Sequence, residues 1–370
     1  MKRSLDKIQI SGFKSIRQLD EFPLGNLNIL VGANGAGKSN FIDYFRMLRA
    51  MAEGNLQGFI TKKGGADSFF YNGPKETKQI NSHLVFGENQ YRFILEPSAD
   101  GLMVKSEEVF WEGKGRWDYE GGGGSESHLP NWKDMKSQWG PWPSVEAYVY
   151  NAVSNWTVYH FHDTSFTAPM RREQPLRDNR ALNPDASNIA AYLLYLQKNS
   201  TQRYDRIKES IKLVAPFFDD FSLEPEKKGE NELIRLEWRQ KSSSFPFQPW
   251  DFSDGTLRFI CLATTLLQPS ICAPSTVLID EPELGLHPFA LDVLAGLIRE
   301  ASENTQLIIS TQSVSLLNHF APSEIIIVDR DSGASTFKHL VESDYDTWLE
   351  EYSLGELWQK NVFEGGPRYE

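Results

Sequence analysis

The chain has few cysteines and no excess of basic residues. Its 370 residues include only two cysteines, Cys261 and Cys272, which form no Cys-x-x-Cys pair. Two separated cysteines exclude a disulfide scaffold and a cysteine-rich zinc site, and they indicate a reducing compartment. The formal net charge is −12, which argues against a protein that coats nucleic acid with a basic surface.

Long apolar runs are also missing. The longest apolar stretches, such as residues 259–267, are far shorter than the roughly 20 residues of a membrane-spanning helix. The first residues, MKRSLDKIQISGF, lack the apolar core of a signal peptide. We therefore expect a cytoplasmic protein without a membrane segment. Hydrophobic residues make up 40% of the chain and charged residues 24%, which is an ordinary globular composition.

Apolar strands alternate with amphipathic segments over much of the chain, which predicts an α/β fold around a parallel sheet. The expected buried strands are residues 27–31, 276–280, 306–310 and 324–329. The expected helices include residues 39–53, 256–267 and 289–300. Residues 5–10 alternate apolar and polar side chains, which predicts an edge strand. From about 68 to 112, short runs separated by Asn-Gly and similar turns predict antiparallel hairpins.

Tryptophans are concentrated in and around residues 112–155. They are Trp117, Trp132, Trp139, Trp142 and Trp156. We interpret this stretch as a compact insertion packed by aromatic side chains, in preference to a surface that stacks on bases.

Residues 32–39 read GANGAGKS, a full match to the phosphate-loop pattern Gly-x-x-x-x-Gly-Lys-Ser between an expected strand and an expected helix. The glycines let backbone N–H groups wrap a phosphate, and the helix start adds the positive end of its dipole. Lys38 is expected to reach the β- and γ-phosphates and Ser39 to bind Mg²⁺. We therefore expect ATP and Mg²⁺ as ligands, with ATP bound by Asn34, Gly35, Ala36, Gly37, Lys38, Ser39 and Asn40.

A second strand ends in two acids, because residues 276–281 read TVLIDE. Asp280 would hold Mg²⁺ with its water shell. Glu281 would lie beside the γ-phosphate and orient or deprotonate the attacking water. Alone, such acids would be an ordinary solvated strand end. Together with the phosphate loop, they predict an ATPase.

Residues 252–258 read FSDGTLR and open an expected helix before this strand. Here the sequence resembles the ATP-binding-cassette (ABC) ATPases, in the branch that includes the RecF, SMC and Rad50 proteins. The family signature has a serine and a glycine at a helix N-terminus, here Ser253 and Gly255, and Asp254 replaces its usual first glycine. The resemblance implies that these residues bind the γ-phosphate of ATP held by another protomer. It therefore implies a head-to-tail homodimer with ATP between the protomers.

Motifs along the chain narrow the resemblance to the stand-alone predicted ATPases of the AAA15/AAA21 type. These motifs are ISGFKSI (10–16), YHFHDTS (159–165), DEPELGLHP (280–288), STQS (310–313) and YSLGELW (352–358). The implied fold class is α/β, an ABC-ATPase phosphate-loop fold with an antiparallel β subdomain and a helical lobe. We divide the chain into three parts. Residues 1–165 contain the phosphate loop, the β subdomain and the tryptophan-rich insertion, and residues 166–250 form the helical lobe. Residues 251–370 contain the signature helix, the acidic strand, the switch strand and the tail.

Further residues take roles from the resemblance. Gln312 stands where the wider family has a switch histidine. A glutamine can donate an amide hydrogen bond to the γ-phosphate but cannot titrate. His162 and Asp163 stand where the family has a glutamine that touches Mg²⁺, and either could substitute for it. His162 is thus a candidate metal ligand, although a histidine at a strand end is more often structural. Lys14 is expected near the adenine pocket.

Basic residues cluster on the lobe and its linker, at Arg171, Arg172, Arg177 and Arg180 and at Arg203, Arg206, Lys208 and Lys212. A groove that faces DNA is one interpretation. A solvated surface is the other. For the second cluster, interleaved acids favour the solvated surface. For the first cluster, the two interpretations stay open.

The resemblance also bears on partners. The sequence contains no long heptad array, so we expect no coiled-coil arm of the SMC or Rad50 type. Only about 40 residues follow Asp329, too few for the Toprim domain of overcoming-lysogenization (OLD) nucleases, so any nuclease is expected to be a separate Toprim-like chain. We thus expect an ATP-hydrolysing dimeric switch in DNA processing, repair or anti-phage defence, without a membrane partner. The alternatives are an ATP-dependent scaffold with little turnover and, less favoured, the ATPase subunit of a transporter.

Overall fold

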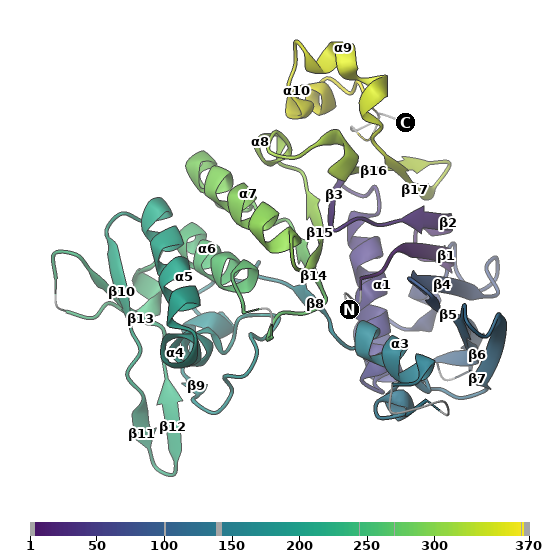
Figure 1. Ribbon diagram of the computed structural model, residues 1–370, viewed down its shortest axis with the longest axis horizontal. Coiled ribbons are helices and arrows are strands. Elements are labelled where there is room, and N and C mark those ends of the chain that lie inside the picture. The colour runs from purple at the N-terminus through teal and green to yellow at the C-terminus, as the bar shows by residue number, and fades with distance from the viewer. Residues whose placement is uncertain are drawn as a thin grey trace.

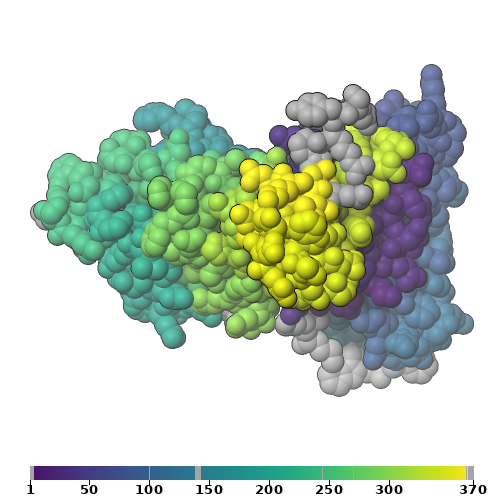
Figure 2. All heavy atoms as spheres, turned by 90° about the horizontal axis from the view of Figure 1, so that it is seen from above, coloured from purple at the N-terminus to yellow at the C-terminus, as the bar shows by residue number. Residues whose placement is uncertain are grey.

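The computed structural model describes residues 4–99, 101–137, 143–243, 245–269, 271–363 and 365. Two six-stranded sheets organise one end of the molecule, and a separate lobe extends at the other end (Figure 1). In the view of Figure 2, the C-terminal helices lie between the lobe and the antiparallel sheet. The mixed α/β class agrees with the sequence prediction.

The first sheet has the strand order β17-β16-β3-β15-β14-β8 and is parallel except for β17. Its strands are β3 (Leu27–Val31), β8 (Trp156–Tyr159), β14 (Thr276–Asp280), β15 (Gln306–Thr311), β16 (Ile325–Asp331) and β17 (Ala334–His339). Every residue of β3 is buried, because helices or the second sheet cover both faces of this parallel sheet. The carboxyl ends of β3, β14 and β15 therefore meet at one edge.

The second sheet is antiparallel, with the order β2-β1-β4-β5-β6-β7. Its strands are β1 (Lys7–Phe13), β2 (Ile16–Pro23), β4 (Ile80–Phe86), β5 (Asn89–Ser98), β6 (Gly101–Trp111) and β7 (Arg116–Gly121). The hairpins expected from 68 to 112 are confirmed. The edge-strand prediction for residues 5–10 was wrong, because β1 pairs with β2 on one side and β4 on the other.

Two hydrophobic cores lie on opposite faces of the parallel sheet. Helix α1 (Lys38–Ala52) fills the space between the two sheets, where Phe41 and Phe45 pack with Leu30 and Leu278. The other face contacts the helices of the lobe and of the C-terminal half. The remaining helices of this body are α2 (Leu56–Lys62), α3 (Val145–Val153), α6 (Asp254–Leu266), α7 (Pro288–Ser302) and α8 (Val314–Leu317), with single-turn helices at Ala66–Phe69, Leu129–Trp132 and Pro322–Glu324.

The tryptophan-rich stretch packs largely as expected. Trp132 and Trp156 are buried in the core around α1. Trp117 lies under the guanidinium of Arg92, 4.0 Å from its ring centre. Trp139 and Trp142 lie outside the described residues. The aromatic packing interpretation is confirmed for Trp132 and Trp156, whose burial leaves no face for a base.

The lobe between residues 166 and 250 contains strands as well as helices. Its helices are α4 (Ile189–Asn199) and α5 (Thr201–Val214), with single turns at Pro169–Arg171 and Pro249–Asp251. Its strands are β9 (Gln174–Pro175), β10 (Phe218–Ser222), β11 (Glu226–Lys228), β12 (Asn231–Ile234) and β13 (Glu237–Gln240). The strands are short and form two small sheets, so their periodicity was too brief to be read from the sequence.

The C-terminal segment runs along the parallel sheet from α8 to the phosphate loop. It contains a turn at Glu342–Asp344, α9 (Asp346–Leu349) and α10 (Leu354–Gln359). The Gly355 N–H donates to Asn318 Oδ1 at 2.7 Å, just beyond α8. The Gly365 carbonyl accepts from the Ala33 N–H at 2.8 Å. The YSLGELW motif thus supports the helix that follows Gln312.

Among the residues that the structure describes, no helix has the length and apolar character that crossing a membrane requires.

Candidate nucleotide site

The phosphate loop joins β3 to α1, and two of its glycines are required by close contacts. A Cβ atom on Gly32 would lie 2.0 Å from the Val328 carbonyl oxygen. On Gly37, which has φ +119°, it would lie 2.0 Å from Ser335 Oγ. Larger residues would therefore displace β16 or β17 from the loop. Gly35, Asn34 and Ser39 are exposed, so the loop presents its backbone to solvent.

Lys38 and Asn40 hold the loop from inside. Lys38 Nζ donates to the carbonyls of Gly32 at 2.7 Å and Ala33 at 3.1 Å. Burial lowers the pKa of this amine, an effect opposed by the nearby carboxylates of Glu281, Asp280 and Glu283. Asn40 Nδ2 donates to Ser15 Oγ at 2.7 Å, which attaches the turn between β1 and β2 to the start of α1. Because α1 begins at Lys38, the N–H groups of its first turn have no intrahelical partner and can bind an anion.

The acids expected from TVLIDE lie at the end of β14, beside the phosphate loop. Asp280 accepts a hydrogen bond from the Ser310 hydroxyl on β15. The Glu281 N–H donates to the Ser310 carbonyl at 2.9 Å. Glu281 has φ +45°, a conformation uncommon for a residue with a side chain. Such strain is found where a fold must aim a functional group.

Gln312, one residue beyond the end of β15, touches two glutamates. Its side-chain amide donates to Glu281 Oε1, and its backbone N–H donates to Glu283 Oε1 at 2.8 Å. Burial raises the pKa of Glu283, and the hydrogen bond from Gln312 works in the opposite direction. Among the described residues, the buried Glu283 Oε2 has no hydrogen-bond partner. Gln312 thus holds Glu281 in place, and sequence reasoning missed the contribution of Glu283.

His162 lies near the acids but uses one nitrogen for the backbone. Its Nε2 is 2.9 Å from the Asp280 carbonyl oxygen. Because a carbonyl only accepts, Nε2 must donate there and cannot bind a metal. The prediction that His162 binds Mg²⁺ therefore remains a prediction for its other ring nitrogen, Nδ1. In this structure Nε2 fixes the backbone of Asp280.

Lys14 is engaged by an ion pair with α1. Its Nζ lies 2.6 Å from Asp43 Oδ2. Arg46 and Lys63 also contact Asp43, at 2.9 and 3.1 Å. Burial alone would raise the pKa of Asp43, but hydrogen bonds from these three cations outweigh it and lower the pKa to about 2. Lys14 therefore ties the β1–β2 turn to the phosphate-loop helix.

The signature residues form the exposed start of α6. Ser253 is the N-cap, and its Oγ accepts from the Thr256 N–H at 3.2 Å. A Cβ atom on Gly255 would lie 2.3 Å from the Gly285 carbonyl oxygen. Glycine is therefore needed for α6 to approach the segment that follows Glu281. Asp254 is the first residue of the helix, with 66% of its side chain exposed.

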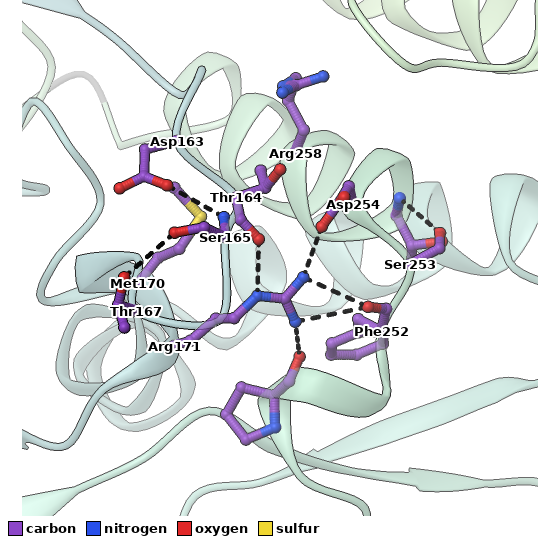
Figure 3. A network of polar contacts seen from close by, with 12 residues as sticks. Asp163, Thr164, Ser165, Thr167, Met170, Arg171, Phe252, Ser253, Asp254 and Arg258 are labelled. Atoms are coloured by element: carbon purple, nitrogen blue, oxygen red, sulfur yellow. Dashed lines mark hydrogen bonds and ion pairs between the residues drawn. The ribbon is translucent and has the colours of Figure 1, made fainter.

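Two arginines that the sequence did not single out for this site hold the start of α6. Arg258, on α6, donates to the carbonyls of Phe161 at 2.9 Å and His162 at 3.2 Å and to the Leu284 carbonyl. Arg171 contacts Asp254 (Figure 3). The signal for Arg258 was a charged residue inside the apolar run TLRFICLATTL. A buried charge there needs partners.

The two basic clusters differ, because acids pair with the second one whereas the first contains a buried arginine. Arg171 is only 5% exposed, so the DNA interpretation is wrong for this residue. In the second cluster, Arg206 pairs with Glu300 at 3.0 Å and Lys208 with Asp220 at 3.2 Å. The solvated, ion-paired interpretation is confirmed for that cluster.

The donor set is suited to Mg²⁺ bound together with a nucleotide. Among the described residues, no group of three or more His, Cys, Asp or Glu side chains could hold a metal ion. Mg²⁺ in nucleotide sites takes one or two protein oxygens and completes its octahedron with water and phosphate. The Ser39 hydroxyl and the Asp280 carboxylate would supply these ligands, with Ser310 orienting Asp280.

Comparison with known proteins gives a family and a fold. A family model described as "AAA domain, putative AbiEii toxin, Type IV TA system" matches residues 27–318. The fold is similar to an SMC head bound to the C-winged helix domain of ScpA, with a TM-score of 0.53 and 17% identity over 93% of this chain and 99% of that chain. It is also similar to an Smc head domain with an extended coiled coil, bound to the C-terminal domain of ScpA derived from Pyrococcus furiosus, with a TM-score of 0.54 and 17% identity over 94% and 98%. Among curated proteins, none matches this chain significantly.

Proposed function

The chain belongs to the AAA-domain family described as putative AbiEii toxin, Type IV TA system, and from this premise we propose that it binds and hydrolyses ATP as a nucleotide-dependent dimeric switch. Its fold is that of the SMC heads, as expected for a stand-alone ATPase of the RecF/SMC branch. The observation that carries the proposal is the meeting of four groups at one sheet edge. These are Lys38, Asp280, Glu281 and Gln312, brought there by β3, β14 and β15.

Each group has a role in phosphoryl transfer to water. Lys38 and the N–H groups of residues 34–39 bind the phosphates. Glu281 accepts the proton of the water that attacks the γ-phosphorus, while the bond to the bridging oxygen of ADP breaks. Gln312 holds the Glu281 carboxylate and can donate to the γ-phosphate. When bound between Ser39 and Asp280, Mg²⁺ would neutralise charge on the phosphate oxygens.

A second copy completes the proposed site. The exposed start of α6 offers free N–H groups at Ser253–Gly255, and it is a separate helix from the one that follows the phosphate loop. A head-to-tail dimer lets each protomer present α6 to the ATP held by the other. The SMC heads similar in fold each bind a separate chain, ScpA, which supports a separately encoded effector here. A Toprim-like nuclease acting on DNA, in repair or in anti-phage defence, is the effector class we favour.

A second candidate is an ATP-dependent scaffold with little turnover. Gln312 cannot titrate, and Asp254 places a negative charge in the signature, and both features favour slow hydrolysis. Glu281, held by Gln312, favours hydrolysis instead. If the unmodified protein releases phosphate no faster than the Glu281→Gln variant at steady state, the scaffold would be supported.

The experiment is light scattering on the Glu281→Gln protein with and without Mg-ATP. Removing the base while keeping the shape should trap ATP, so we expect a nucleotide-dependent shift from monomer to dimer. The Lys38→Ala, Glu281→Gln double variant is the control and should stay monomeric. A fixed assembly that ignores ATP would contradict the switch and favour the scaffold.

A further inference from the structure

Asp254 creates an electrostatic problem at the start of α6. Under the proposed function, on which this inference rests, that helix start receives the γ-phosphate of the partner's ATP. A carboxylate at the first helical position is favourable for the free helix. It repels a second anion brought to the same N–H groups. A signature with an exposed acid therefore needs a compensating cation close by.

Arg171 is that cation, and every nitrogen of its guanidinium is engaged (Figure 3). Nη2 lies 2.8 Å from Asp254 Oδ1. Nε donates to the Thr164 carbonyl at 3.0 Å, and the terminal nitrogens reach the carbonyls of Phe252 at 3.4 Å and of Pro249. The guanidinium thus lies behind α6, joined to the residues before its first turn.

Burial makes this contact set costly to break. Arg171 is 5% exposed, whereas 66% of the Asp254 side chain is exposed. The carboxylate is therefore at the surface and the cation beneath it. A guanidinium remains charged at all relevant pH values. Removing Asp254 leaves it with three carbonyl partners and an unneutralised charge directed toward the surface.

The same arginine reaches the nucleotide side of its own protomer. Thr164, whose carbonyl accepts from Arg171, follows His162 by two residues. His162 in turn donates to the backbone of Asp280 at 2.9 Å. Arg258 donates to the His162 carbonyl from α6. The loop between β8 and the lobe is therefore attached to Asp280 at one end and to the start of α6 at the other.

We propose that Arg171 is a positioning residue that neutralises Asp254 and fixes the start of α6, so that a signature containing an acid can accept the partner's γ-phosphate. Arg171 is not a DNA ligand. Its effect belongs to dimer formation and leaves ATP binding within one protomer unchanged. Because it acts through charge on Asp254, its loss is corrected by removing that acid.

The test is a double-mutant cycle in the Glu281→Gln protein, with the dimer dissociation constant in Mg-ATP measured by light scattering. We expect Arg171→Gln to weaken the dimer at least tenfold. Asp254→Gly alone should leave it as tight or tighter, and the double variant should return to within about threefold of the parent. Arg172→Gln, at the exposed neighbouring position, is the matched control and should match the parent.

Three results would overturn the inference. The first is a dimer dissociation constant that Arg171→Gln leaves unchanged. The second is a double variant whose dimer is as weak as that of Arg171→Gln alone. The third is a dimer that Asp254→Gly alone weakens more than tenfold. If Arg171→Gln does not fold, Asp254→Gly alone still tests the inference, because Arg171 keeps its three carbonyl contacts in that variant. A second measurement, ATP binding at protein concentrations too low for the dimer to form, distinguishes failure of the proposed function from failure of the role of Arg171. If the parent binds no ATP, the proposed function fails, whereas normal binding with an unaffected cycle rejects only the role of Arg171.

Discussion

Two helix starts in this molecule, those of α1 and α6, share free N–H groups but lie in opposite charge environments. Around the start of α1, Lys38 lies near the carboxylates of Asp280, Glu281 and Glu283, at and just beyond the end of β14. At the start of α6, the acid Asp254 is at the surface and the cation Arg171 is buried. Under the proposed function, the first arrangement would hold a phosphate and Mg²⁺ within one protomer. The second would receive a phosphate that another protomer delivers.

Each helix is also anchored by a charge cluster of opposite design. Asp43, on α1, is an acid contacted by three cations from β1–β2, α1 and the residue after α2. Arg171 and Arg258 are cations that contact carbonyls around α6. The body of α1 is buried between the two sheets, whereas the start of α6 is exposed, as the proposed contact with a partner requires. The N–H groups of a helix start are common to both sites, so the side chains that surround and anchor each helix start distinguish the two.

The largest effect is expected for ATP binding after a substitution at the start of α1. Lys38→Ala removes the charge beneath the phosphate loop, and a lost hydrogen bond to a charged group corresponds to about a hundredfold in affinity. We expect ATP binding to fall by at least that factor, measured by titration calorimetry on the monomer. Unchanged affinity would show that α1 is not the cis nucleotide site.

A substitution at the other start should affect only the dimer. Ser253→Arg places a long side chain where the partner's phosphate is expected, so hydrolysis should fall by about tenfold or more, as for loss of one positioned group. ATP binding to one protomer should stay within about twofold, because α6 is not part of the cis site. Phosphate release and fluorescent-nucleotide binding measure the two quantities. Wild-type hydrolysis in this variant would exclude the trans role of α6.

The anchor of α1 should be visible in stability and in its pH dependence. Asp43 has a pKa of about 2 in the folded chain, below its value in an unfolded chain, so its contribution of about 2 kcal/mol is complete above about pH 4. It is lost as the pH falls through about 2. We expect Asp43→Asn to lower the free energy of unfolding at pH 7 by about this amount.

Denaturant titrations at pH 7 and pH 3 measure that change, and Asp67→Asn, at an exposed position, is the control. An equal effect of both variants at pH 7 would contradict the role of the cation cluster.

The smallest effects compare two helical glycines. Gly255→Ala would place a Cβ atom 2.3 Å from the Gly285 carbonyl oxygen, whereas no described residue beyond the surrounding helix lies within 4 Å of a Cβ atom on Gly296 in α7. Gly255→Ala should therefore destabilise by about 1–3 kcal/mol, as overpacking does. Gly296→Ala should stabilise by about 0.5–1 kcal/mol, as expected in an open helix. Thermal denaturation gives both signs, and stabilisation by both variants would show that α6 does not require glycine there.

Much of the parallel sheet could be predicted from the sequence, because each buried strand is a local apolar run and each following helix has its own periodicity. The strands of the lobe could not, since β11 and β12 are only three and four residues long and mostly exposed. The sequence also could not predict that β1 is an interior strand of its sheet. An alternating pattern indicates one buried face but does not reveal how many neighbours a strand has.

The phosphate loop, the acidic strand end and the N-cap of α6 could be predicted from the chain alone, because each depends on residues adjacent in it. Three contacts instead depend on how distant segments fold together. They are the pairing of Gln312 with Glu281, the turn of His162 toward the Asp280 backbone, and the attachment of Lys14 to Asp43. The fold also places Arg171 against Asp254, 83 residues away. A local motif carries its own geometry, whereas two charges far apart in the chain become partners only when the fold brings them together.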